Sequence, residues 1–316
     1  MPPVRIEAPA KLNLNLKIGD RRPDGFHAID SLFIALAWGD TLSVETVPGS
    51  HSPPLLEIFM DNYAIPPEEN IIARAVDLFR SGTGYDRSLK ITVQKRIPPG
   101  SGLGGGSSDA AAALLALSML KGSGDGAIME MGASLGSDVP FFLGSSPAAH
   151  ASGRGEVLQP LDLPDSFKNL SFVLIKPDFS SNTAEAYRML DMSRGAVVEN
   201  LGMEVPFLDK SPKNWDFSND FLPVFLADAK AGAIYRQIFT CLREQGAEFT
   251  GLSGSGSACF GVFSNGEEAQ VAKKALSEQC SIAVVTFPLA HWAVPYYNVV
   301  EEDQRREGER HGDYRH

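Results

Sequence analysis

The chain has 316 residues, 43% of them hydrophobic, and carries a formal net charge of −11. This length can hold two domains with cores of their own, and the negative balance disfavours binding to nucleic acid or to an anionic membrane surface. No apolar run approaches the roughly 18 to 20 residues that span a bilayer, and the N-terminal segment MPPVRIEAPAK lacks the apolar stretch of a secretory signal. We therefore expect a cytoplasmic protein without a membrane segment. Its three cysteines have no metal-like spacing and predict reduced thiols, at Cys241, Cys259 and Cys280.

The first half of the chain mixes strand-like and helical segments. Apolar and β-branched runs predict four strands, at Arg5–Ala8, Leu12–Ile18, Thr41–Val47 and Lys90–Lys95. Apolar residues at helical spacing predict a helix from Asn70 to Phe79, and Asn70 is a plausible cap for it.

The segment Pro9–Leu16, PAKLNLNL, alternates apolar and polar residues. In a strand, this alternation places the leucines on one face and the polar residues on the other. The two sets are Leu12, Leu14 and Leu16, and Lys11, Asn13 and Asn15. Taken alone, the polar set is typical of a strand face that is open to solvent.

The most informative segment is PPGSGLGGGSSDAAA, residues 98–112, which holds five glycines and leads into an alanine-rich apolar run. Glycine lets backbone N–H groups approach a ligand closely, and a helix that starts directly afterwards adds unpaired N–H groups and the positive end of its dipole. Together these features predict a phosphate-binding loop. A flexible surface linker is the alternative, but a linker has no need of a strand before it and a helix after it.

The loop fits neither of two common phosphate motifs. Gly100, Gly102 and Gly105 satisfy the dinucleotide pattern G-x-G-x-x-G, but the preceding strand alternates as a half-exposed strand does, and two prolines interrupt the required tight turn. The acidic residue expected about 20 positions later falls on Glu130, in a helical-looking segment. No Gly-Lys-Ser/Thr closes the loop, which excludes a P-loop.

A third segment, LGSDVPFF at residues 135–142, places Asp138 two residues before a proline. An aspartate in this position is ordinarily a helix cap. Local pattern alone therefore does not make Asp138 catalytic.

A polar, proline-bearing connector at residues 161–170 divides the chain. We expect domains at 1–160 and 161–297 and a charged, disordered tail at 298–316. The second half predicts a strand at Ser171–Lys176, a helix opened by the capping box Asn182–Glu185, a Gly/Ser turn at Gly251–Gly256 and a strand at Ala258–Phe263.

In combination these motifs point to one family. PAKLNLNL, PPGSGLGGGSSDAA, LGSDVPFF and GLSGSGSA, in this order, resemble the small-molecule kinase superfamily that includes galactokinase, homoserine kinase, mevalonate kinase and phosphomevalonate kinase. RPDGFH at 22–27, Asp40-Thr41-Leu42 and FSND at 217–220 narrow the resemblance to the 4-diphosphocytidyl-2-C-methyl-D-erythritol kinase family. The match covers nearly the whole chain up to about Pro288, and the R-x-D-G-[YF]-H element is its most specific part.

The resemblance implies an α/β plus α+β architecture. An N-terminal α/β domain with a left-handed βαβ crossover would be followed by a C-terminal ferredoxin-like domain, with the active site between them. The implied reaction transfers the γ-phosphoryl group of ATP to the 2-hydroxyl of diphosphocytidyl-methylerythritol, in the non-mevalonate isoprenoid pathway. ATP and Mg²⁺ would be the only cofactors, and this small molecule the partner. The oligomeric state, monomer or homodimer, is not indicated.

Family roles carry over to matching positions. Asp138 matches the aspartate that takes the hydroxyl proton, and Lys11 the lysine that holds that carboxylate ionised and stabilises the nucleophile. Phosphoryl transfer otherwise needs positioning and charge neutralisation. The ATP phosphates would lie on the loop from residue 99 to 108, with Ser107 or Ser108 near Mg²⁺. The loop residues are Pro99, Gly100, Ser101, Gly102, Leu103, Gly104, Gly105, Gly106, Ser107 and Ser108.

On the base and substrate sides, the resemblance implies that Phe26 stacks on the cytosine and that His27 hydrogen-bonds to it. Tyr187 matches an aromatic residue on the far side of that base, and Thr183 a nearby polar contact. Asn13 matches a position close to the methylerythritol. The remaining matches are Asn70 and Lys95 around adenine, and Gly254, Ser255 and Gly256 over the substrate diphosphate.

Three positions depart from the family or find no counterpart. Phe26 stands where many relatives have tyrosine, so stacking survives without a hydroxyl contact. An anion at Asp109 would oppose phosphate, so we expect Asp109 to turn away and cap the helix. Ser193–Asp216 aligns with nothing.

Rival readings are a sister kinase acting on mevalonate or homoserine, a catalytically silent nucleotide-binding protein and, more distantly, an NAD-dependent oxidoreductase. The RPDGFH element argues against the first, and the presence of both Lys11 and Asp138 against the second.

Overall fold

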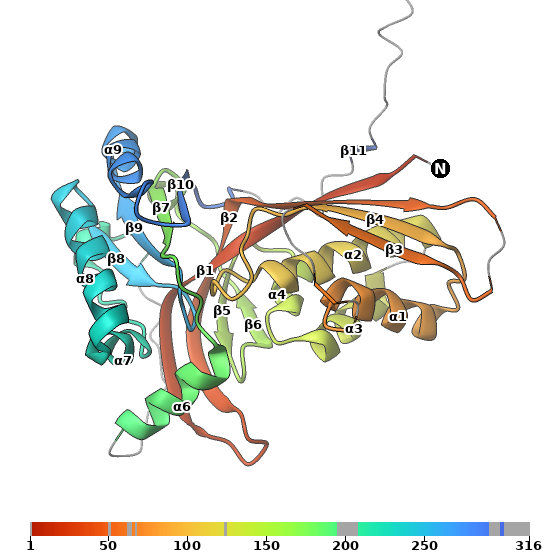
Figure 1. Ribbon diagram of the computed structural model, residues 1–316, viewed down its shortest axis with the longest axis horizontal. Helices are drawn as coiled ribbons and strands as arrows, with labels where there is room; N and C mark the ends of the chain where they lie inside the picture. The colour runs from red at the N-terminus through yellow and green to blue at the C-terminus, as the bar shows by residue number, and fades with distance from the viewer. Residues whose placement is uncertain are drawn as a thin grey trace, which may run out of the picture.

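The chain builds two β-sheets, each covered by helices (Figure 1). The computed structural model describes residues 2–49, 52–61, 65–66, 68–122, 125–194, 208–290 and 298–299. Within these residues, no helix is both long and apolar enough to cross a membrane.

The first sheet has the strand order β11-β1-β2-β4-β3, and β5 joins it through β2 and carries β6. Its strands are β1 (Val4–Arg21), β2 (His27–Thr46), β3 (Leu56–Met60), β4 (Leu89–Gln94), β5 (Ala148–Ser152), β6 (Val157–Pro160) and β11 (Asn298–Val299). β3 and β4 are parallel and are joined through α1 (Ile71–Thr83), which forms the expected βαβ crossover. Parallel neighbours need such a crossover because a hairpin cannot join them.

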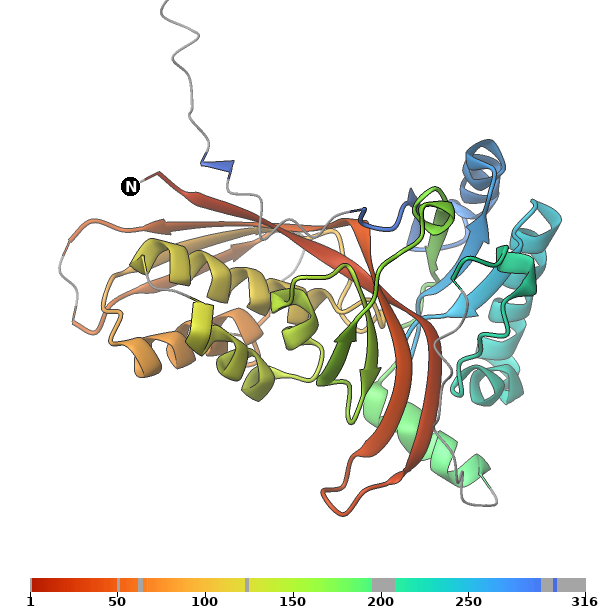
Figure 2. The same cartoon turned by 180° about the vertical axis from the view of Figure 1, so that it is seen from behind.

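Four helices lie together on one face of this sheet, in both views of the chain (Figures 1 and 2). They are α1, α2 (Gly105–Lys121), α3 (Ile128–Leu135) and α4 (Val139–Leu143), with the short turn η1 (Asp125–Ala127) before α3. α2 is the central one, since it contacts β1, β2 and the other three helices. Its run of buried alanines presents only methyl groups to these neighbours, and short side chains let the elements approach closely. This packing fixes the N-terminal end of α2.

β1 is one strand where the sequence predicted two. Pro9 interrupts the pattern but is absorbed at a register shift between Pro9 and Lys11, as expected of a residue without an N–H group. A second shift lies between Asn13 and Asn15. An extra residue reverses the facing of the side chains that follow. The expectation that the three leucines share a face is therefore wrong at Leu16, which packs in one hydrophobic cluster while Leu12 and Leu14 pack in the other.

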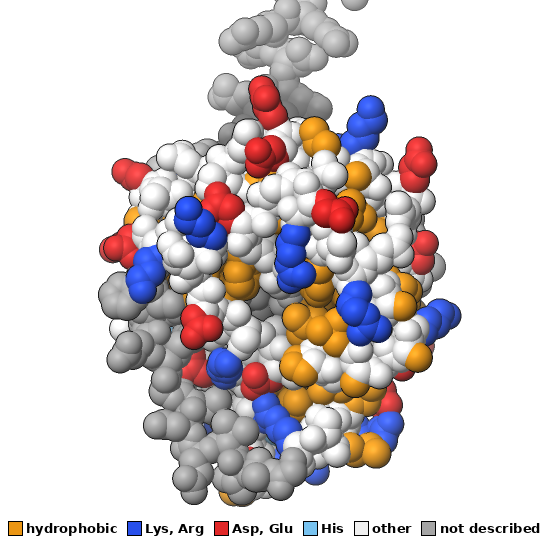
Figure 3. Space-filling model, turned by 90° about the vertical axis from the view of Figure 1, so that its left-hand side faces the viewer, with side chains coloured by type: hydrophobic (Ala, Val, Ile, Leu, Met, Phe, Trp, Pro, Cys, Tyr) orange, Lys and Arg blue, Asp and Glu red, His pale blue; other side chains and the backbone are white. Residues whose placement is uncertain are grey.

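The second sheet is antiparallel with the order β10-β7-β9-β8. Its elements are β7 (Ser171–Lys176), α6 (Thr183–Ser193), η2 (Pro212–Asn214), α7 (Leu222–Ala227), α8 (Ala229–Glu244), β8 (Phe249–Leu252), β9 (Cys259–Phe263), α9 (Gly266–Leu276) and β10 (Ile282–Thr286). The order of strands and of the helices between them is that of a ferredoxin-like unit, as expected. On the outer face in Figure 3, acidic and basic side chains are interspersed rather than gathered by sign.

The predicted connector holds only the short helix α5 (Asp165–Lys168) and lies between β6 of the first sheet and β7 of the second. Beyond it, the structure places residues 298–299 in β11 against Val4 and Arg5, so the predicted tail does not begin as a disordered segment. The rest of that tail, from residue 300, lies outside the described residues, as do residues 195–207 of the segment that had no counterpart.

Some strands escaped prediction. β2 begins at His27, although only its last residues were predicted, because AIDSLFIALA is almost continuously apolar and shows no period of two. Most of its residues are buried, as in a strand covered on both faces.

Candidate active site

Lys11 on β1 and Asp138 at the start of α4 meet, with 3.2 Å between Nζ and a carboxylate oxygen. The Lys11 side chain is 5% exposed and that of Asp138 is 29% exposed, so the carboxylate is the accessible partner. Lys11 Nζ also donates to Asn13 Oδ1 at 2.6 Å and lies 4.3 Å from the centre of the Phe33 ring. The polar face of this strand is therefore buried, and not solvated as the pattern alone suggested.

Asp138 holds the cap position of α4 but makes no capping hydrogen bond with its side chain. A structural cap would accept an N–H of the first turn. The carboxylate instead faces Lys11, which leaves it available for chemistry.

The glycine-rich loop reaches the same place. Gly100, Gly102 and Gly104 have φ values of +65°, +77° and +72°, in the left-handed region that glycine adopts without strain. Gly104 caps α2 and offers no side chain to its first N–H groups, and Lys11 N donates to Leu103 O at 2.9 Å. The open N-terminus of a 17-residue helix thus lies beside the Lys11–Asp138 pair, where an anion is favoured.

A second loop, from Ser253 to Ser257, packs on the first. Ser253 Oγ donates to Gly102 O at 2.9 Å, and Ala258 N donates to Ser101 O at 2.9 Å. A Cβ on Gly102 would stand 2.3 Å from Ser253 O, so only glycine allows this approach. The structure therefore brings together the two Gly/Ser segments that the sequence predicted separately.

Asn13 lies between these loops and the strand pair. Its amide donates to Ser31 Oγ at 2.8 Å, and its backbone N lies 3.3 Å from Ser253 Oγ. A Cβ on Gly254 would be 3.3 Å from Asn13 Oδ1. Asn13, Lys11 and the second loop thus form one continuous surface.

The residues predicted around the cytosine lie where α6 meets the β1–β2 hairpin (Figures 1 and 2). His27 and Tyr187 stack with 4.8 Å between ring centroids and 15° between planes. His27 Nε2 lies 2.9 Å from a carboxylate oxygen of Asp191. Phe26 is 54% exposed and lies under Arg154, 5.0 Å from its guanidinium carbon. The exposed Phe26 ring is a surface on which a base can stack, whereas the His27 side chain is only 8% exposed.

Tyr187 lies between this surface and the Lys11–Asp138 pair. Burial, together with the negative charges of Asp138 and Asp191, raises the pKa of Tyr187 to about 12. Tyr187 therefore stays protonated at neutral pH, with one carboxylate from each end of the site nearby. Thr183, on the same helix, shares a 2.9 Å hydrogen bond with Ser255 of the second loop.

Of the two residues predicted around adenine, Asn70 caps α1. Its side chain accepts from Ile72 N at 3.0 Å, so it has the ordinary structural role that the sequence left open. This end of α1 lies close to the glycine loop, since a Cβ on Gly106 would be 3.6 Å from Ile71.

Lys95 sits in a buried cluster with Asp40 and Asp109. Its Nζ lies 2.5 Å from the Asp40 carboxylate and 2.7 Å from that of Asp109. Asp40 also accepts the backbone N–H groups of Arg96 and Ile97 at 2.5 and 2.8 Å, which anchors the chain entering the glycine loop. The Lys95 ammonium is thus already bound by two carboxylates.

The expectation that Asp109 caps α2 is wrong. Gly104 holds the cap position, and Asp109, further along the helix, is buried and binds Lys95. Burial, together with the charge of Asp40, raises the pKa of Asp109 to about 7 despite the opposing effect of Lys95. Asp109 lies on the buried face of α2, where its carboxylate pairs with the Lys95 ammonium. It therefore does not accept a backbone N–H group at the start of the helix.

Ser107 and Ser108, the residues expected near Mg²⁺, lie in the first turn of α2. Ser108 Oγ in the first turn of α2 is buried and has no hydrogen-bond partner, and Ser107 is half-buried beside it. An unpartnered hydroxyl at this end of the helix is placed to donate to a phosphate oxygen or to bind a metal ion through its own oxygen. In the part of the chain that is described, no cluster of three or more His, Cys, Asp or Glu side chains could hold a metal ion by itself.

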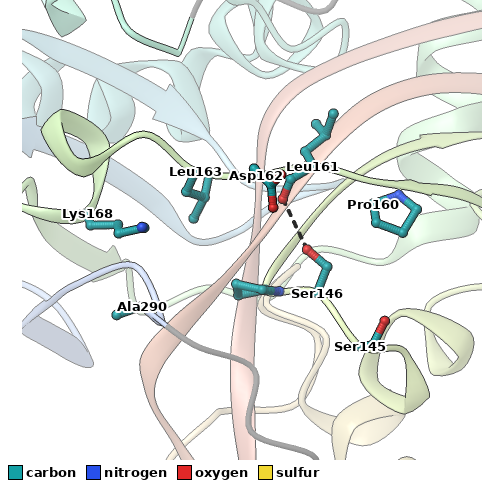
Figure 4. A pocket seen from close by; sticks show the side chains of 9 residues that line it. Ser145, Ser146, Pro160, Leu161, Asp162, Leu163, Lys168 and Ala290 are labelled. Carbon is teal, nitrogen blue, oxygen red and sulfur yellow. Dashed lines mark hydrogen bonds between the residues drawn. The ribbon is translucent and has the colours of Figure 1, made fainter.

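A pocket of about 560 Å³ lies apart from these residues (Figure 4). Ser145, Ser146 and Pro147 line one side, and residues 160–163 of the connector line another. Ser146 Oγ donates to Leu161 O at 3.1 Å. None of the predicted site residues lines it.

Sequence reasoning missed several residues that hold the site. They are Ser31, Asp40, Asp191, Asn219 and Ser253. Asp40 and Asn219 stand in motifs that carried the family resemblance, so their presence there was a signal. Asp191 follows Tyr187 by four residues, which places both on one helix face.

Family models match both halves of the chain. The model described as GHMP kinases N terminal domain matches residues 70–145, and the one described as GHMP kinases C terminal matches residues 216–282. The first includes the glycine loop and Asp138.

Curated proteins named 4-diphosphocytidyl-2-C-methyl-D-erythritol kinase are similar over most of the chain. The one from Anaeromyxobacter sp. (strain Fw109-5) is 37% identical over 276 residues, 86% of either chain. The one from Ralstonia nicotianae is 37% identical over 293 residues, 91% of this chain and 96% of its own.

Two solved kinase structures have folds similar to that of this chain. A crystal structure of 4-(cytidine 5'-diphospho)-2C-methyl-D-erythritol kinase has a TM-score of 0.73 and 31% identity, and the match covers 90% of this chain and all of that one. A homoserine kinase from Cytophaga hutchinsonii, with a TM-score of 0.63 at 15% identity over 93% of this chain and 97% of its own, shares the fold.

Proposed function

The chain belongs to the 4-diphosphocytidyl-2-C-methyl-D-erythritol kinase family, and on this premise we propose how its residues phosphorylate that substrate. It is an ATP-dependent small-molecule kinase, and the alcohol is the 2-hydroxyl of 4-diphosphocytidyl-2-C-methyl-D-erythritol. The observation that supports the site assignment is the contact between Lys11 and Asp138 beside the open end of α2.

Asp138 accepts the proton of the substrate hydroxyl. It is the more exposed member of the pair and is free of capping bonds, so it can approach a bound alcohol. Lys11, with its ammonium 3.2 Å from that carboxylate, stabilises the charge that develops on the substrate oxygen. A positioned base of this kind contributes about 10²- to 10⁴-fold to a rate.

The glycine loop and the start of α2 hold the phosphates through backbone N–H groups, with Ser107 or Ser108 toward the metal. When bound, ATP would supply the phosphoryl group, and Mg²⁺ would neutralise part of the negative charge on the phosphates. Asn70 and Lys95 belong to the adenine side. The Lys95 ammonium is bound to Asp40 and Asp109, and its backbone N–H donates to Asp61, so a contact with adenine would come from the backbone carbonyl of Lys95.

Phe26, His27 and Tyr187 hold the cytosine, and Thr183 lies near them. Asn13 contacts the methylerythritol, and Gly254, Ser255 and Gly256 lie over the diphosphate. Residues from both predicted domains, 1–160 and 161–297, therefore contribute to one site at their junction. A cytoplasmic location follows for an enzyme of small soluble metabolites and stays a prediction.

The test is ADP release from Mg²⁺-ATP with three alcohols, the cytidyl substrate, mevalonate and homoserine. We expect turnover with the cytidyl substrate alone. Turnover with another alcohol would make the chain a sister kinase. ATP binding without turnover of any alcohol would leave a silent nucleotide-binding protein.

A further inference from the structure

A short segment of the second half of the chain is joined to the edge of β1. Leu16 N donates to Ser218 O at 2.8 Å, and Asp220 N donates to Leu16 O at 3.0 Å, so Asn219 forms a parallel bridge with Leu16. Ser218 N also donates to Asn15 Oδ1 at 2.8 Å. The segment is thereby fixed next to the part of β1 that carries Lys11 and Asn13.

The side chain of Asn219 extends from this segment to the second loop. Its amide nitrogen donates to Leu252 O and Gly254 O, at 2.9 Å each. Its oxygen accepts from Phe221 N at 2.9 Å, and the residue is 6% exposed. Every polar atom of this buried amide is therefore used, and two of its bonds reach the loop.

These two bonds flank Ser253. Ser253 is fully buried, and its hydroxyl is the group that donates to Gly102 O and lies near Asn13 N. Holding the carbonyls on either side of a residue fixes the position of its side chain. Asn219 thus fixes the position of the second loop on the glycine loop.

We propose that Asn219 is a positioning residue for phosphoryl transfer. It holds the second loop, Ser253 to Ser257, against Gly102 and Asn13. The substrate hydroxyl and the phosphoryl group on the glycine loop are thereby kept at reacting distance. The inference rests on the proposed function for its kinetic consequence. A misplacement of about 1 Å can cost about 100-fold in rate, so a loosened loop should reduce kcat more than it changes the KM for ATP.

The test compares Asn219→Asp with Asn219→Ala and a matched control. Asn219→Asp keeps the shape and the acceptor for Phe221 N but removes both donors to the loop. Asn265→Ala is the control, because Asn265 caps α9 in the same unit through a bond to Glu267 N and does not touch the loop. Ser253→Ala, alone and combined with Asn219→Ala, tests whether both residues act through one contact.

We expect both Asn219 variants to lower kcat per folded molecule by about 10- to 100-fold, and Asn265→Ala to lower only the melting temperature. The double variant should be no slower than the slower single variant, since the two residues share one contact. Wild-type kcat in folded Asn219 variants, or effects of Asn219 and Ser253 that multiply, would overturn the proposal.

Deuterium exchange keeps this test separate from the test of the proposed function. In the ligand-free protein, amides of residues 252–258 should exchange faster in Asn219→Asp than in the wild type or in Asn265→Ala. If the wild type turned over no alcohol, the proposed function would fail while this measurement still decided whether Asn219 holds the loop. Unchanged exchange would overturn the positioning role.

Discussion

Lys11 Nζ lies 3.2 Å from a carboxylate oxygen of Asp138. Lys11 is on the first strand, and Asp138 stands at the start of α4, a helix that packs against the N-terminal end of α2. Neither residue is catalytic by its local pattern, and each has an ordinary structural explanation when considered alone. Their contact beside an open helix N-terminus removes those explanations, because Lys11 is buried and Asp138 caps nothing.

Asp138→Asn should lower kcat by about 10²- to 10⁴-fold, the usual contribution of a general base. The melting temperature should change little, because the side chain makes no capping bond. ADP release and thermal unfolding of the same preparation measure both. A lower melting temperature with undiminished activity per folded molecule would return Asp138 to a structural role.

Gly102→Ala should disrupt the contact between the glycine loop and the second loop. The new Cβ would stand 2.3 Å from Ser253 O at a φ of +77°, so the KM for ATP should rise at least about tenfold as the loop shifts. Gly122→Ala is the matched control, because Gly122 has a similar φ of +69° and no neighbour within 4 Å of the new Cβ. Strain alone costs about 1 to 2 kcal/mol in either variant. Equal KM values in the two variants would refute a role for the contact.

Phe26→Ala should raise the KM for the cytidyl substrate about 5- to 100-fold, since stacking of one base on an aromatic ring contributes about 1 to 3 kcal/mol. The ring is 54% exposed, so stability should hardly change, and the KM for ATP should stay the same. Steady-state kinetics with each substrate varied in turn is the measurement. A KM for the cytidyl substrate like that of the wild type would place the cytosine elsewhere.

Asp109→Asn should alter how stability depends on pH. Burial raises the pKa of Asp109 from 3.8 to about 7 in the folded protein, so the folded state binds a proton that the unfolded state releases. The contribution of Asp109 to stability is therefore complete below about pH 4 and is lost as the pH rises to about 7.

Urea unfolding of the wild type and of Asp109→Asn between pH 4 and 8 checks this. The free energy of unfolding of the wild type, relative to that of the variant, should fall across this interval. The physical cause is the burial of the Asp109 carboxylate, which outweighs the opposing effect of Lys95 and is reinforced by the charge of Asp40. A difference that is constant with pH would mean that Asp109 stays ionised throughout.

Much of the local structure of this protein could be predicted from its sequence alone. The caps Asn70 and Asn182 were found because a capping side chain and its N–H partner lie within three residues. Of the predicted capping box, only the half in which Asn182 accepts from Glu185 N is formed. The glycine loop before α2 was likewise predictable from one short segment, and the family motifs indicated the kinase reaction.

Tertiary structure alone decided which of these segments meet. The shift between Asn13 and Asn15 sends Leu16 to a different core from Leu14, and no period in the sequence announces it. The burial of Asp109 against Lys95 and the reach of Asn219 to Leu252 and Gly254 depend in the same way on how distant elements pack. Hydrogen bonds within a few residues are specified by local residue types, whereas those across the fold exist only once bulges, register and packing have set the distances.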